Sequence, residues 1–161
     1  DFYHFYGNAN SYICSPGWYR TEARIIKNSV RSYAPDGLFW LVLDSNKKGR
    51  YPKAKHTAVH CYHYGWIRSE DEMNLKSEKV QKYWSGKPVK IDYSQMDQSI
   101  IKQFSGTHPA VVHDWLPRAE GVFQVDQKYT LTKKQKKHRI MLKLEKLFGL
   151  ELSKKHFKLV K

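Results

Sequence analysis

The hydrophobic positions of this chain fall into short runs separated by turn-forming residues. Residues 2–6 are an aromatic run that ends at Gly7, which predicts a strand. Residues 8–17 are rich in Asn, Ser, Pro and Gly and predict a loop, and residues 22–27 predict a second strand. The apolar run 38–43 follows a turn at 34–37 and predicts a buried strand, with a hairpin loop over 44–49.

The chain then returns as a strand over 50–64, basic at first and aromatic at its end, where the run 58–66 stands out. Strand periodicity places His60, Tyr62 and Tyr64 on one face, and Val59, Cys61 and His63 on the other. A strand that leads into a helix is a common place for a functional site. The residue types leave a second interpretation open, a buried aromatic strand whose histidines only bond to the backbone.

Three helices are predicted after this strand. Ser69 and Glu72 form a capping box, and their helix is expected to run to Trp84 with a narrow apolar stripe, which favours a surface position. Residues 95–104 predict a second helix, and residues 109–117 a short third one that begins at a proline.

A fourth helix is predicted from residue 131 or 132 to Phe148, with Gly149 as its C-terminal cap. Helical periodicity places Ile140, Met141, Leu144, Leu147 and Phe148 on one inward face. Its first turns carry Lys133, Lys134, Lys136, Lys137, His138 and Arg139. Because positive charge is unfavourable at a helix N-terminus, this run indicates an external anion, an anionic membrane surface or, less favoured, a nucleic acid. A solvated charge run is the alternative interpretation.

Composition indicates a folded protein with an anionic partner. The 161 residues suffice for one α+β domain, expected as a small mixed or antiparallel sheet with several helices over 1–130, followed by the basic helix and tail over 131–161. Lys and Arg number 29 against 15 Asp and Glu, a net charge of +14 that favours a polyanion, a phosphate-bearing ligand or an anionic membrane. A surface that merely solubilises the protein stays open. Two cysteines are read as reduced thiols in a cytoplasmic protein.

The residue types offer several candidates for chemistry, although no phosphate-binding loop, HExxH or G-x-S-x-G motif is present. His60 and His63 face opposite sides of a strand and cannot share a metal there, but His63 alone can supply one ligand. Arg20, Arg24, Arg31 and Arg68 are candidates for phosphate contacts, and Glu22 and Asp36 for a general base. Each of these, taken singly, also fits an ordinary surface residue.

Several segments together resemble a known family. They are His4–Gly7, Trp18–Asn28, Arg31–Tyr33, Tyr62–Arg68 and Phe104–Val112, in this order. Over nearly the whole chain they are similar to the C-terminal half of bacterial family 2 glycosyltransferase-like proteins with a GT-A fold. The resemblance implies a preceding nucleotide-sugar-binding half with an Asp-rich metal motif. A start inside a strand-like run, without Met, also predicts that the chain is a piece of a longer protein.

The resemblance also implies roles for individual residues. His63 would be a further ligand to a divalent metal, Mn or Mg, that holds the donor diphosphate, and Arg20, Arg24 and Arg68 would offset phosphate charge. The aromatic residues Tyr6, Trp18, Tyr64 and Trp66 would stack on sugars.

The acceptor base would be Asp36 or Glu22, and Glu22 gains weight because the stretch after Arg31–Tyr33 is shorter here than in the relatives. The expected function is the acceptor side of a glycosyltransferase, inactive as this piece alone, acting in the cytoplasm and associated with the membrane's cytoplasmic face. The alternative is a non-enzymatic basic module that binds nucleic acid or an anionic membrane.

Overall fold

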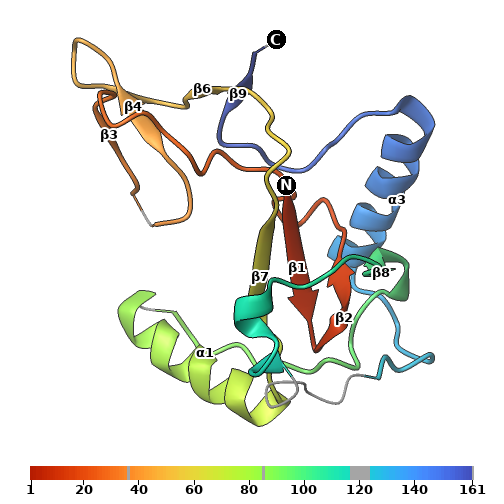
Figure 1. Ribbon diagram of the computed structural model, residues 1–161. Helices are drawn as coiled ribbons and strands as arrows, with labels where there is room; N and C mark the ends of the chain where they lie inside the picture. Colours follow the sequence, from red (N-terminus) through yellow and green to blue (C-terminus); the bar gives the residue numbers. More distant parts are fainter. Residues whose placement is uncertain (36, 85, 117–123, 161) are drawn as a thin grey trace.

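A four-stranded mixed sheet lies at the centre of the molecule (Figure 1). The computed structural model describes residues 1–35, 37–84, 86–116 and 124–160. The strand order is β7 (Cys61–Trp66), β1 (Phe2–Tyr6), β2 (Asn8–Ile13) and β8 (Ile101–Gln103). β1 runs parallel to β7, and the other neighbours are antiparallel. The expected α+β class with a small mixed sheet is therefore confirmed.

The hairpin of β1 and β2 replaces the loop that was predicted over 8–17, a prediction that is wrong for its first half. Gly7 takes a left-handed conformation (φ 71°), which allows the sharp turn. Asn8 stabilises the turn because its side-chain oxygen accepts from the Asn10 amide at 2.9 Å and the Ser11 hydroxyl at 3.0 Å. Alternate residues of β2 are buried. Its polar composition hid this strand periodicity.

A three-stranded antiparallel sheet of β3 (Ser32–Tyr33), β4 (Leu41–Leu43) and β5 (Gly49–Arg50) projects from the central sheet (Figure 1). The strand predicted over 38–43 is confirmed only for its second half, and the loop that follows it is confirmed. The strand predicted over 22–27 is wrong, since that segment has no regular structure. The long strand predicted over 50–64 is divided into three short strands, β5, β6 (Lys53–Ala54) and β7. β6 pairs with β9 (Lys158–Leu159) and does not belong to the central sheet.

Two helices carry the signals read from the sequence. α1 (Glu70–Trp84) begins with the predicted capping box, in which the Ser69 amide donates to Glu72 Oε2 at 3.0 Å. α3 (Lys133–Phe148) has Thr132 as N-cap and Gly149 as left-handed C-cap. Among the helices that the structure describes, none combines the length and apolar character needed to cross a membrane.

The helices predicted over 95–104 and 109–117 are reduced to single turns. A 3-10 turn at Gln98–Ile100, capped by Asp97, leads directly into β8, so the longer helix is wrong. A second 3-10 turn spans Ala110–Val112, and residue 117 lies outside the described residues. Residues Ile101–Gln103 pair with β2 instead of continuing a helix.

Two hydrophobic clusters lie on opposite faces of the central sheet. One is built around Tyr6, Ile13 and Met73, and the other around Phe5, Ala9 and Ile67. The predicted alternation is confirmed within β7, because Tyr62 and Tyr64 pack with the second cluster while His63 faces the other way, onto His4.

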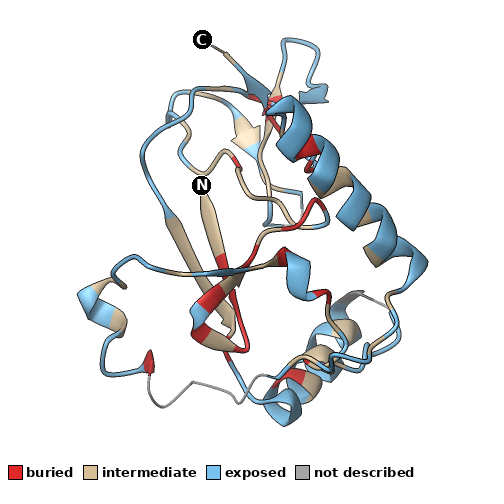
Figure 2. Cartoon of the chain, turned by 90° about the vertical axis from the view of Figure 1, so that its right-hand side faces the viewer, coloured by how far each residue is buried: buried red, intermediate tan, exposed pale blue. Residues whose placement is uncertain are grey.

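The predicted inward face of α3 is wrong. Leu147 is 74% and Phe148 64% exposed, and Ile140 and Leu144 are exposed as well. Figure 2 shows α3 as a largely exposed helix beside the buried central strands. The buried residue of α3 is Glu145. The inward side of α3 carries Glu145, which accepts from Arg20, and Leu142, which packs against the first hydrophobic cluster.

Candidate functional site

Two histidines meet across the parallel strands β1 and β7. His4 stands opposite His63 in the strand register, and their Nδ1 atoms are 2.9 Å apart. His4 is buried, and its Nε2 lies 2.7 Å from the carbonyl oxygen of Tyr19. This contact was not foreseen from the sequence, because it depends on two segments that are 59 residues apart.

Both rings are neutral at neutral pH. Burial lowers the pKa of His4 to about 4, although its hydrogen bond with the Tyr19 carbonyl acts in the opposite direction. Burial also lowers the pKa of His63, and the charges of Lys76 and Arg24 lower it further. A neutral imidazole carries one ring proton, so each ring has one donor and one acceptor nitrogen.

The hydrogen-bond partners fix where those protons lie. A carbonyl oxygen only accepts, so Nε2 of His4 donates to Tyr19 and Nδ1 of His4 is left as an acceptor. Nδ1 of His63 must then donate to His4. Nε2 of His63 keeps a bare lone pair, and the described residues provide no hydrogen-bond partner for it. This nitrogen is the open ligand of the pair.

Gly65 leaves room beside that nitrogen. A Cβ placed on Gly65 would lie 2.7 Å from Nε2 of His63, closer than two such atoms can approach. The neighbouring Gly65 carbonyl accepts from the Lys76 ammonium at 3.1 Å. The open nitrogen therefore lies among backbone atoms and positive charge.

The predicted arginines separate in the structure. Arg24 stays near the histidine pair, with its guanidinium 5.1 Å from the Phe2 ring centroid and 5.7 Å from that of Tyr19. Arg68 is exposed immediately before α1. The charge of Arg24 lowers the pKa of both His4 and His63, so Arg24 is the arginine of the two that acts on the histidine pair.

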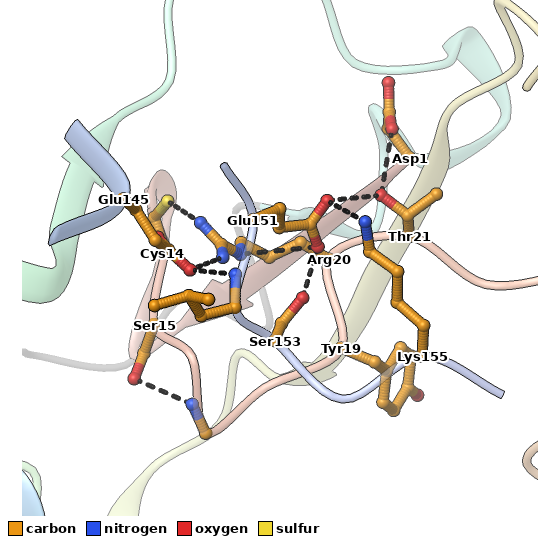
Figure 3. Close-up of polar contacts among 12 residues, drawn as sticks. Asp1, Cys14, Ser15, Tyr19, Arg20, Thr21, Glu145, Glu151, Ser153 and Lys155 are labelled. Atoms are coloured by element: carbon orange, nitrogen blue, oxygen red, sulfur yellow. Dashed lines mark hydrogen bonds and ion pairs between the residues drawn. The ribbon is translucent and has the colours of Figure 1, made fainter. Parts of the chain in front are cut away.

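Arg20 belongs to a buried network instead (Figure 3). Its Nη2 donates to Glu145 Oε1 at 2.5 Å, its Nη1 donates to the Cys14 sulfur at 3.7 Å, and its Nε is 3.8 Å from Glu151. These contacts join the start of the chain to α3 and the tail. Hydrogen bonds to Glu145 and Cys14 outweigh the effect of burial and raise the pKa of Arg20. Its charge is balanced by protein carboxylates.

The predicted sugar-stacking rings also divide. Trp18 and Trp66 are half-buried and meet edge to face at 5.4 Å, next to the buried Tyr6. Tyr64 lies on the opposite face of the sheet, stacked on Phe5. Of the four predicted rings, Tyr6, Trp18 and Trp66 therefore share a face of the sheet with the histidine pair.

The candidate base Glu22 is held by His156. Its side chain is 1% exposed, and its Oε2 lies 2.6 Å from Nδ1 of His156, whose ring stacks on Phe39 at 4.3 Å. Its Oε1 accepts from the Ala23 amide at 3.0 Å. No local sequence pattern points to His156, because it lies 134 residues away from Glu22. The other candidate base, Asp36, lies outside the described residues.

A cavity of about 470 Å³ opens next to Glu22. Its wall is formed by segment 22–27, by residues of β4 to β6, and by the starts of β1 and β7. Phe2 lines the cavity and stacks on His4 at 5.3 Å. The cavity and the histidine pair are therefore successive parts of one face of the β1–β7 pair.

The basic turns of α3 are divided between solvent and protein. Lys133, Lys134, Lys136 and Lys137 are exposed. Arg139 instead binds the buried Asp97 with two hydrogen bonds, of 3.0 and 2.6 Å.

Within the described ranges, no three His, Cys, Asp or Glu side chains come together in a way that could hold a metal ion. His63 can therefore contribute at most one ligand to a metal whose other ligands come from elsewhere. Comparison of the chain with protein-family models, with curated proteins and with solved structures finds no match.

Proposed function

We propose that this chain is the acceptor-side portion of a nucleotide-sugar-dependent glycosyltransferase with a GT-A-type fold. The observation that carries the proposal is the open Nε2 of His63, oriented by His4 and surrounded by the charges of Arg24 and Lys76. A histidine whose second nitrogen is fixed by a hydrogen bond is the usual form of a metal ligand. Cationic neighbours suit the diphosphate that such a metal accompanies.

His63 would bind Mn²⁺ or Mg²⁺ together with ligands from the nucleotide-binding half. When bound, the metal supplies positive charge to the leaving nucleoside diphosphate. Arg24 and Lys76 repel a bare divalent cation and attract phosphate. We therefore expect the metal to bind His63 only in company with the diphosphate.

Glu22 is the described candidate for the acceptor base because it lines the cavity, and its carboxylate would have to leave its contact with His156 to take a proton from the acceptor. His156 fixes the orientation of its carboxylate through the 2.6 Å contact. Trp18 and Trp66 would contact a sugar through the parts of their rings that do not pack against the first hydrophobic cluster, on the same side of the sheet as His63.

The test is metal-dependent diphosphate binding by the full-length protein, measured by calorimetry with UDP or GDP and Mn²⁺. His63→Ala should weaken this binding at least tenfold, about 1.4 kcal/mol. The matched control is His60→Ala, because His60 is an exposed neighbour of β7. Unchanged binding in His63→Ala would remove His63 from the role.

One observation favours a second function, attachment to an anionic membrane surface through α3. Exposed Leu147 and Phe148 lie on the same helix as the exposed lysines of its first turns. Apolar side chains inserted below lipid headgroups, with lysines at the phosphates, stabilise such a helix at a membrane. Binding of a nucleic acid through the lysines would leave Leu147 and Phe148 without an apolar partner.

Co-sedimentation with vesicles that contain phosphatidylserine tests this function. Leu147→Gln should reduce binding several-fold, whereas the same change at Leu75, an exposed leucine of α1, should not. Binding to a polynucleotide that survives Leu147→Gln, with no binding to vesicles, would assign the lysines to nucleic acid instead.

A further inference from the structure

The cavity beside Glu22 is rich in unpaired positive charge. Five of its described lining residues are cationic, namely Arg24, Lys27, Arg50, Lys53 and Lys55. None of them forms an ion pair within 4 Å with any acidic residue in the described part of the chain. Like charges gathered on one concave surface repel each other and are stabilised by a bound anion.

The two acidic residues of the wall are occupied elsewhere. The carboxylate of Glu22 contacts His156 at 2.6 Å and the Ala23 amide at 3.0 Å. The carboxylate of Asp1 contacts His56 at 3.0 Å. Neither acid is paired with a lysine or arginine of the cavity, so the wall keeps a positive potential.

The remaining wall is apolar and includes an aromatic ring. Trp40, Val42 and Pro52 line the side formed by β4 and the segment before β6. A tryptophan face packs against the CH groups of a sugar ring in the same manner as against other apolar groups. A volume of about 470 Å³ lies in the range of small-molecule sites and accommodates a monosaccharide with one charged substituent.

We propose that this cavity binds an anionic sugar, that is, a sugar that carries a phosphate or a carboxylate group. The charged group would contact Arg50 and Lys53, and the sugar ring would lie on Trp40. That this sugar is the acceptor of transfer rests on the proposed function; that the cavity binds it does not.

The experiment follows the indole and amide signals of ¹⁵N-labelled protein by NMR during titration with glucose 6-phosphate, glucuronic acid, glucose, inorganic phosphate and UMP. Glucose 6-phosphate or glucuronic acid should shift the Trp40 indole signal in a saturable way. Glucose should bind at least tenfold more weakly, and so should phosphate, because each lacks one half of the recognised group. Which of the two anionic sugars binds more tightly identifies the charged substituent.

Lys53→Gln and Arg50→Gln should each weaken binding of the preferred sugar about tenfold. The matched control is Lys48→Gln, a lysine of the β4–β5 loop that does not line the cavity. Equal binding by all three variants, tighter binding of UMP or of phosphate alone, or no saturable shift with either anionic sugar would overturn the proposal. These outcomes are independent of His63 and UDP, so failure of the cavity assignment and failure of the glycosyltransferase assignment are distinguished.

Discussion

Deleting one partner of the buried pair of Arg20 and Glu145 should strongly destabilise this chain. Glu145→Ala removes the carboxylate that accepts from Arg20 at 2.5 Å and from the Leu152 amide at 2.6 Å. Breaking a buried ion pair by deleting one partner typically costs about 3–5 kcal/mol. The Arg20 side chain is 19% exposed and Glu151 stays 3.8 Å from its Nε, so the lower end, about 3 kcal/mol, is expected.

Urea unfolding followed by circular dichroism measures the effect. The matched control is Glu78→Ala, an exposed glutamate of α1, which should change the free energy of unfolding by no more than about 0.5 kcal/mol. The double variant Arg20→Met with Glu145→Leu should recover most of the loss, because it leaves no buried charge. A loss below about 1 kcal/mol in Glu145→Ala would refute the reasoning, since the pair would then behave as a surface ion pair.

Two substitutions and one spectroscopic measurement test single features of the structure. Gly7→Ala should lower the free energy of unfolding by about 1–2 kcal/mol, because an L-residue is strained at φ 71°; an unchanged urea midpoint would contradict this turn. Burial raises the pKa of Asp97, but hydrogen bonds from Arg139 and Ser99 outweigh it and hold the pKa below its usual value. The stability that this carboxylate contributes is thus present above about pH 4 and lost as the pH falls. The difference in free energy of unfolding between the unmodified protein and Asp97→Asn should therefore shrink in acid. A difference that does not change with pH would contradict this role of Asp97. ¹⁵N spectra at pH 7 should show the Nε2–H form of His4 and the Nδ1–H form of His63. The reverse tautomers would place a proton on Nε2 of His63, which could then not bind a metal.

The elements that could be predicted are those whose signals are local. The capping box at Ser69 and Glu72 and the C-cap at Gly149 lie within one turn of the backbone groups they satisfy. The aromatic runs of β1 and β7 predict strands through their residue types alone. In each case the interacting groups are neighbours in sequence.

The features that could not be predicted depend on distant partners. β2 is polar in composition and becomes a strand because β1 and β8 pair with both of its edges. α3 turns Glu145 and Leu142 inward and leaves its predicted apolar stripe largely exposed, and the partner of Glu145 is Arg20, 125 residues away. Periodicity places residues on a common face of a helix, but it does not decide which face the rest of the protein covers.

The candidate site was predicted in part from local periodicity, but its decisive contact comes from a distant segment of the chain. Strand periodicity alone separated His63 from His60, and the structure adds His4, which fixes the proton of His63 and opens its other nitrogen. Phe2 then links this pair to the basic cavity by stacking on His4. An open ligand nitrogen, cationic surroundings and an anion-sized cavity thus follow one another along one face of two parallel strands. Under the proposed function, this order would place the donor diphosphate and the anionic acceptor side by side, as transfer between them requires.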